Sequence, residues 1–147
     1  MLEGFTNIDF VAHPGVVEWD FLDLWPLERG PLFEGAFSED TLEHFFLAEQ
    51  QYILCSLNVL LKPGATARLL MPSFTRLGEL APAAVAPGGF LRETFGVTTP
   101  VDGINMGLRF SGHRWLHDDE SLSLLARECG FRPEKSVCAL SREARFN

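Results

Sequence analysis

The chain has 147 residues, which suits one domain with a single core, and 46% of them are hydrophobic. Its net charge is −8, so binding to a nucleic-acid backbone, which requires a basic surface, is disfavoured. The apolar runs are short and the N-terminus has no signal-peptide pattern, so we expect a soluble cytoplasmic protein that does not enter a membrane.

Two strands are predicted near the start of the chain. The segment GFTNIDFVA ends near Val11, ahead of the turn residues His13-Pro14-Gly15. The segment VVEWDFLDLW is rich in β-branched and aromatic residues and passes into a loop near Asp23. The run GAFSE predicts the tip of a third strand.

A long amphipathic helix is predicted from Glu39 to Pro63-Gly64. Apolar residues recur there at three- and four-residue steps, which is the spacing of one helix face. Ser38 is placed to cap this helix, and Glu39 and Asp40 occupy its first turn, where the helix dipole favours negative charge. Proline and glycine end it. The run ATARLLMPS then predicts a strand that ends at Pro72.

We expect a single domain over residues 1–147, with residues 74–112 as a variable insertion or lid. That stretch is rich in Ala, Pro and Gly, and only FLRETFG and INMGLRFSG have room for helical turns. A clear helix follows in HDDESLSLLARECGF, capped by Asp118 or Asp119 and closed by Gly130. FRPEKSVCAL predicts a last strand. This alternation predicts an α/β fold with a mainly parallel sheet flanked by helices.

Ligands of parallel α/β sheets bind beyond the carboxyl ends of the strands, which directs attention to the acids found there. Asp9 could accept the two hydroxyls of a ribose, or it could be an ordinary turn residue. Asp20 and Asp23 lie around apolar Phe21. A carboxylate beside an apolar slot suits an adenine, whereas the alternative is a strand that leaves the core through a polar loop.

A second group of candidates follows the third predicted strand. Glu39, Asp40, Glu43 and His44 fall within six residues. A Glu or His there could orient a substrate or act as a base. Complementation of the helix dipole is the alternative explanation of the first two acids.

A third group stands just before the last helix. His113 and Arg114 precede Trp115, and a helix start of this kind favours anions. A structural loop anchored by the tryptophan is the alternative.

A metal is not expected, because no second ligand cluster with a recognised spacing is present. The three cysteines, Cys55, Cys129 and Cys138, form no Cys-x-x-Cys pair. They are expected to be small buried hydrophobic residues in a reducing compartment.

Taken in order, GFTNIDF, VEWDFLDLWPL, FEGAFSEDTLEHF, VLLKPGATARLLMPSF and GHRWLHDDESLSLLARECGF resemble the class I S-adenosylmethionine-dependent methyltransferases over nearly the whole chain. Leu42-Glu43-His44 followed by Leu61-Lys62-Pro63-Gly64 is similar to the small bacterial type. The resemblance implies a Rossmann-like class I methyltransferase fold and S-adenosylmethionine as cofactor. It also implies N-terminal truncation, because the family's first strand and Gly-rich turn have no counterpart and no Gly-x-Gly occurs before residue 35.

The resemblance implies roles by position. The residues expected to bind the cofactor are Asp9 at the ribose, Asp20 and Phe21 at the adenine, and Ser38, Glu39 and Asp40 at the methionine end. The residues expected near a small-molecule methyl acceptor are His44, His113 and Arg114.

Two functions stay open at this point. The chain is a methyltransferase, or it is a non-catalytic methyltransferase-fold binding or scaffold domain. The missing glycine loop favours the second, and the retained Asp9, Asp20 and Leu-Glu-His motif favour the first. Because an exposed sheet edge invites pairing, we expect a homo-oligomer, a dimer or larger, or a partner subunit that covers the edge.

Overall fold

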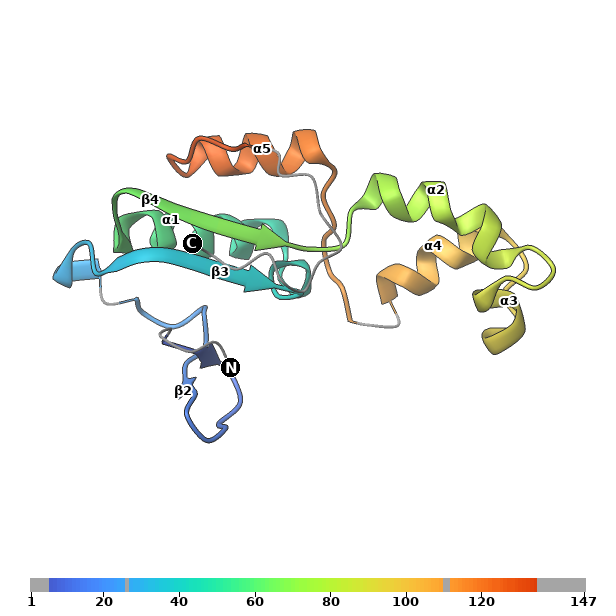
Figure 1. Ribbon diagram of the computed structural model, residues 1–147, viewed down its shortest axis with the longest axis horizontal. Coiled ribbons are helices and arrows are strands. Elements are labelled where there is room, and N and C mark those ends of the chain that lie inside the picture. Colours follow the sequence, from blue (N-terminus) through green and yellow to red (C-terminus); the bar gives the residue numbers. More distant parts are fainter. Residues whose placement is uncertain (1–5, 26, 110–111, 135–147) are drawn as a thin grey trace.

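The computed structural model describes residues 6–25, 27–109 and 112–134. These residues form a mixed α/β structure, in which the four strands lie in the first half of the chain and four α-helices follow the last strand (Figure 1). The elements are β1 (Ile8–Asp9), β2 (Val17–Glu18), the 3₁₀ helix η1 (Leu27–Arg29), β3 (Phe33–Glu39), the 3₁₀ helix η2 (Leu42–His44), α1 (Leu47–Leu60), β4 (Leu61–Leu70), α2 (Phe74–Val85), α3 (Phe90–Phe95), α4 (Pro100–Arg109) and α5 (Asp119–Glu128). Within those ranges, no helix is both long enough and apolar enough to cross a membrane.

The strands form two separate parallel pairs. β1 pairs with β2, and its last residue, Asp9, lies opposite Glu18. β3 pairs with β4, and its last residue, Glu39, lies opposite Leu70. Among the described residues no strand joins the two pairs. The predicted parallel pairing is therefore confirmed, but the described strands do not make one continuous sheet.

Both N-terminal strands are shorter than predicted, because aspartate side chains turn the chain. Asp9 Oδ1 accepts the N–H of Val11 at 3.1 Å, and Asp20 Oδ1 accepts the N–H of Leu22 at 2.9 Å. Such local bonds compete with the hydrogen-bond ladder of a sheet. The predicted second strand, which passed into a loop only near Asp23, is therefore reduced to the two residues of β2.

The predicted helix start at Glu39 is wrong. β3 continues to Glu39, and Asp40 then turns the chain with a φ angle of 48°. This left-handed conformation is one that Asp adopts more readily than most residues. α1 begins only at Leu47, after η2. Ser38 is therefore a strand residue and caps no helix.

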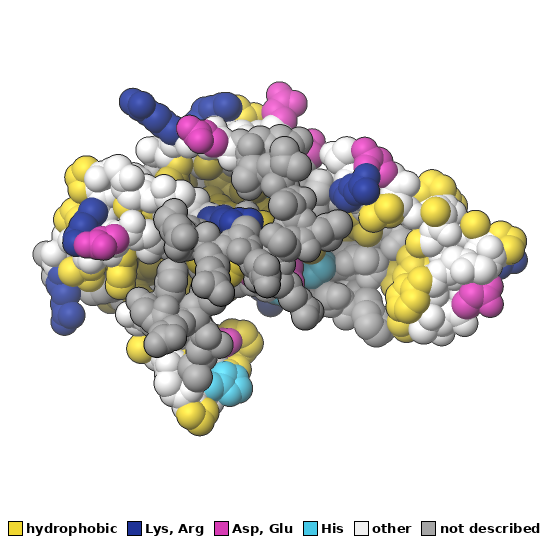
Figure 2. All heavy atoms as spheres, viewed as in Figure 1, with side chains coloured by type: hydrophobic (Ala, Val, Ile, Leu, Met, Phe, Trp, Pro, Cys, Tyr) yellow, Lys and Arg dark blue, Asp and Glu magenta, His cyan; other side chains and the backbone are white. Residues whose placement is uncertain are grey.

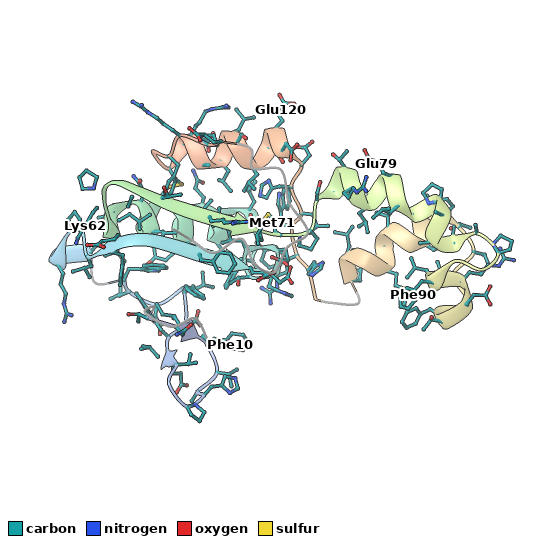
Figure 3. All side chains as sticks on the ribbon, viewed as in Figure 1. Phe10, Lys62, Met71, Glu79, Phe90 and Glu120 are labelled. Atoms are coloured by element: carbon teal, nitrogen blue, oxygen red, sulfur yellow. A yellow bond between two sulfur atoms is a disulfide. The ribbon has the colours of Figure 1, made fainter. Side chains whose placement is uncertain are left out.

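The Lys62-Pro63-Gly64 turn lies inside β4 rather than between a helix and a strand. β4 begins at Leu61, opposite Phe33, and regular pairing resumes only at Thr66. The residues between them bulge outward, and Gly64 takes a φ angle of 83°, which glycine adopts without steric cost. In Figure 3, Lys62 marks this end of the sheet, and Met71 marks the other end, just after β4.

Three helices lie between residues 74 and 109, within the stretch expected to be a variable insertion or lid. α2 packs against α3 and α4, and this helical unit stands beyond the carboxyl ends of β3 and β4 (Figure 1). A Cβ atom at Gly107 of α4 would come within 2.8 Å of Leu77 Cδ1 on α2, so glycine permits the close approach. Hydrophobic side chains gather on the surface of this unit (Figure 2), among them Phe90, which is 67% exposed. Its role as a lid stays a prediction.

α5 matches the predicted last helix. Asp118 caps it: its Oδ1 accepts the N–H of Ser121 at 2.8 Å, and Ser121 Oγ accepts the N–H of Asp118 at 3.1 Å. Gly130 follows the helix with a φ angle of 87°. Residues 131–134 carry no regular structure, and the rest of the predicted last strand lies outside the described residues.

The core lies around α1, between the N-terminal loop, η2 and α5. Its buried members are Trp25, Leu42, Ile53, Leu54, Leu60, Leu125 and Cys129. Cys55 of α1 and Cys129 at the end of α5 form a disulfide, with their Cα atoms 4.4 Å apart. The prediction of separate buried thiols is therefore wrong for these two residues, and Cys138 lies outside the described residues. The disulfide ties α1 to α5.

Candidate functional site

Glu43, His44 and His113 come together from two distant parts of the chain. η2 carries the first two, and Gly112, with a φ angle of 74°, turns the chain into His113. One carboxylate oxygen or ring nitrogen from each of the three residues lies within 4.8 Å of the others. Glu43 Oε1 lies 3.9 Å from His113 Nε2, and the two imidazole rings meet edge to face at 5.1 Å. The structure thus groups residues that the sequence offered in separate motifs.

Backbone hydrogen bonds hold the two segments side by side. The carbonyl oxygen of Glu43 accepts the N–H of Arg114 at 2.7 Å and the N–H of Trp115 at 3.2 Å. The same residue therefore supplies a carboxylate to the cluster and an anchor for the segment that carries His113. The spacing between the two motifs is fixed by main-chain atoms, which no side-chain substitution removes.

The side chain of Gln50 forms hydrogen bonds with both segments from the interior of the protein. It is fully buried on α1, and its side-chain amide donates to the carbonyl oxygens of Leu42 at 2.8 Å, Phe45 at 3.1 Å and Trp115 at 3.2 Å. Its Oε1 lies 2.7 Å from His117 Nε2. Because an amide oxygen can only accept, the proton of this bond belongs to the histidine.

His117 is a structural histidine rather than a member of the cluster. Its other ring nitrogen, Nδ1, lies 3.0 Å from Ser121 Oγ, so both nitrogens have partners. Burial lowers the pKa of His117 below its ordinary value, and the neighbouring Asp118 carboxylate opposes this effect. The imidazole is therefore neutral in the folded protein at neutral pH.

Glu43 is the least satisfied of the buried groups. Its side chain is fully buried, and neither carboxylate oxygen has a hydrogen-bond partner in the described part of the chain. The 3.9 Å contact with His113 is too long for a hydrogen bond. Burial raises the pKa of Glu43 above its ordinary value, and Asp40 adds to this rise. Buried carboxylates with raised pKa values are common in functional sites.

A cavity of about 320 Å³ opens beside the cluster. Its lining residues are Phe46, Leu108, Arg109, His113 and Arg114. The guanidinium of Arg114 lies over the Phe46 ring, 4.9 Å from the ring centre. Two arginines beside an aromatic ring suit a small anionic molecule, since guanidinium groups bind carboxylates and phosphates.

The expected adenine loop lies beside Asp9 and reaches the segment after η2. Trp19, which opens the loop, donates its N–H to the carbonyl oxygen of Asp9 at 2.8 Å. Phe21 meets Phe45 edge to face, with ring centres 6.3 Å apart. Asp20 is exposed at the start of the loop. These expected cofactor residues therefore share one region of the molecule.

Comparison with protein-family models, curated proteins and solved structures found no match. The resemblance to class I methyltransferases therefore rests on the sequence motifs alone.

The expected residues at the methionine end lie elsewhere. Glu39 and Asp40 line a groove of about 1630 Å³ that follows β4 and extends to α5. Ser38 is partly buried in β3. Neither this groove nor the smaller cavity is lined by Asp9 or Asp20. The structure thus divides the expected cofactor residues between two surfaces.

Two residues that shape the site were not among the sequence candidates. Gln50 had a detectable signal, because it occupies the helical stripe that runs through Phe46, Ile53 and Leu57, and a polar residue on an apolar stripe often has buried partners. The sequence contains no such signal for Arg109, because only the packing of α4 brings this residue to the cavity.

Proposed function

We propose that the protein is a methyltransferase with a Rossmann-like fold that uses S-adenosylmethionine. Its adenosine would bind beyond the carboxyl ends of β1 and β2, and its acceptor in the cavity beside His113. The observation that supports this best is the contact of Phe21 with Phe45, 6.3 Å between ring centres, which joins the expected adenine loop to the Leu-Glu-His segment. Parallel strands with acids at their carboxyl ends are the usual setting of such nucleotide sites.

The residues of this region fit the adenosine part of the cofactor. Asp9 ends β1, and the N–H of Val11 engages only its Oδ1, so Oδ2 can accept a ribose hydroxyl. Phe21 offers a partly exposed apolar face for the adenine, and Asp20 can accept from the exocyclic amine. The bound cofactor would supply an electrophilic methyl group. The protein would position the acceptor and accept its proton.

The acceptor side of the proposal lies in the cavity lined by His113, Arg114 and Arg109. The arginines would hold a carboxylate or phosphate of the acceptor. His113, the histidine that lines this cavity, would take the proton that the acceptor loses when its new bond to the methyl carbon forms. A small anionic acceptor follows from this lining.

A partner is part of the proposal, because β1–β2 and β3–β4 are separate pairs in the described residues. Two-stranded sheets are marginal alone and leave unpaired edges. A strand from a second copy or another subunit would join them. Light scattering should show a dimer or a larger assembly, and a monomer would contradict this element.

Calorimetry with S-adenosylhomocysteine tests cofactor binding directly. The informative variant is Asp9→Asn, because the amide oxygen can still accept the N–H of Val11 while the charge is lost. Affinity should fall about 10-fold or more, the usual effect of losing a hydrogen bond to a charged group. The control is Glu18→Gln, which removes the exposed carboxylate opposite Asp9 and should leave affinity unchanged.

Two outcomes would count against the proposal. Absence of binding at millimolar S-adenosylhomocysteine would leave a non-catalytic scaffold as the remaining interpretation of the protein. Equal affinity of the Asp9→Asn variant and the unaltered protein would remove the ribose assignment.

A further inference from the structure

We propose that Glu43, His44 and His113 form a binding site for a divalent transition-metal ion of the zinc class. This inference does not depend on the proposed methyltransferase activity, and it is an alternative to the role of these histidines as proton acceptors, because a ring nitrogen bound to an ion cannot take a proton. One carboxylate and two imidazoles are a common ligand set for catalytic zinc and for non-haem iron. Three protein ligands leave a further coordination position for water or a substrate.

The separation of the ligand atoms is close to what such an ion requires. Bond lengths of about 2.0–2.1 Å in a tetrahedral site place ligand atoms about 3.3–3.4 Å apart. Glu43 Oε1 and His113 Nε2 are 3.9 Å apart, and the full set lies within 4.8 Å. An ion would have to draw the three side chains closer together to reach these distances.

The burial of Glu43 and its lack of hydrogen-bond partners support a bound ion more strongly than the distances do. Its carboxylate is fully buried, and both oxygens lack partners in the described part of the chain. His113 Nδ1 is likewise buried without a partner there. Burial of an unpaired carboxylate is costly. A hydrogen-bonded ion pair with His113 would offset the cost of burying the carboxylate. Glu43 Oε1 and His113 Nε2 are, however, 3.9 Å apart, which is too far for a hydrogen bond. A cation bound between Glu43 Oε1 and His113 Nε2 would neutralise the buried carboxylate.

The other histidines lack this environment. His13 is exposed in the turn between β1 and β2. Both ring nitrogens of His117 are engaged, by Gln50 and Ser121. Within residues 6–25, 27–109 and 112–134, no other group of three or more His, Cys, Asp and Glu side chains has this spacing.

The surroundings supply access and support. His113 lines the 320 Å³ cavity, which gives an ion a route into the cluster. Gln50 holds the carbonyl oxygens of Leu42 and Trp115, the residues that flank the two ligand segments. Rigid supporting shells of this kind raise metal affinity.

The test uses the full chain, freed of metals with a chelator and titrated with Zn²⁺ in a calorimeter. One ion per chain should bind. Glu43→Gln and His113→Asn should each weaken binding more than the roughly 10- to 100-fold typical of outer-shell changes. His13→Gln is the matched control and should bind as the unaltered protein does. Glu43→Gln removes a buried unpaired charge at constant shape, so this variant should remain folded, as circular dichroism will show.

Titration with Co²⁺ identifies the ligands by a second route. Nitrogen and oxygen ligands should give visible absorption bands without the intense thiolate-to-metal band in the near ultraviolet. A thiolate band would mean that cysteines bind the ion and would overturn the proposal. Failure of the unaltered chain to bind Zn²⁺, or unchanged binding by Glu43→Gln, would overturn it as well. None of these measurements involves S-adenosylmethionine, so their failure is distinct from failure of the proposed function.

Discussion

Replacement of Gln50 by leucine should destabilise the protein far more than the same change at the neighbouring Gln51. The side chain is fully buried, and it joins three carbonyl oxygens and His117 at distances of 2.7 to 3.2 Å. Leucine has a similar size, so the change removes the polar contacts and leaves little void. The carbonyl of Trp115 and the N–H of His117 would then be buried without this partner.

The magnitude follows from the chemistry of the amide. Two N–H groups and one oxygen make three full hydrogen bonds, although four polar groups surround Gln50. At about 1 kcal/mol for each net hydrogen bond, the free energy of unfolding should fall by about 3 kcal/mol. Domains have a free energy of unfolding of about 5–15 kcal/mol, so the Gln50→Leu variant should still fold.

Urea unfolding followed by tryptophan fluorescence measures this loss, because Trp25 lies in the core beside α1. The matched control is Gln51→Leu, one position further along the same helix. Gln51 is exposed, and its amide makes only a 3.5 Å contact with Glu128. The control should change the free energy of unfolding by less than about 0.5 kcal/mol. A loss below about 1 kcal/mol for Gln50→Leu, or equal losses for the two variants, would refute the reasoning.

Two further predictions concern pH and redox state. Because burial lowers the pKa of His117 in the folded state, stability should be highest above pH 6.5, the ordinary value of the group, and should fall as the pH drops below it. One proton limits the slope to about 1.4 kcal/mol per pH unit, and urea unfolding from pH 5 to 8 should show this dependence reduced in His117→Gln. Reduction of the Cys55–Cys129 disulfide, which spans 74 residues, should lower the free energy of unfolding by about 4 kcal/mol in the loop-entropy description. Urea unfolding with and without a reductant measures this loss, and the Cys55→Ser variant should behave like the reduced protein. An unchanged urea midpoint after reduction would contradict the presence of the cross-link.

Local signals predicted the elements that depend on local interactions. α5 has its cap, its apolar face and its closing glycine within one continuous stretch, and the structure confirms all of them. The strand predicted from Ala65 to Pro72 also forms, as the later part of β4, which ends at Leu70. The parallel pairing of strands followed from the alternation of the elements along the chain.

Other elements depended on contacts that the local sequence does not contain. The periodic apolar residues from Leu42 onward predicted one helix starting at Glu39, but pairing with β4 extends β3 through that residue. The hydrogen bonds of a parallel strand pair come from a distant segment, so no local pattern reports them. The disulfide was missed for the same reason, since Cys55 and Cys129 meet only when α1 and α5 pack.

The candidate site shows the same division most clearly. The sequence by itself determined which functional groups are present: a carboxylate and an imidazole in Leu42-Glu43-His44, and another imidazole in His113. Only the tertiary structure decided that they meet, through the hydrogen bonds of the Glu43 carbonyl with Arg114 and Trp115. Only the tertiary structure buried the Glu43 carboxylate away from any described partner. The physical reason is that residue type is fixed in the chain, whereas burial and distance arise from packing between segments far apart in the sequence.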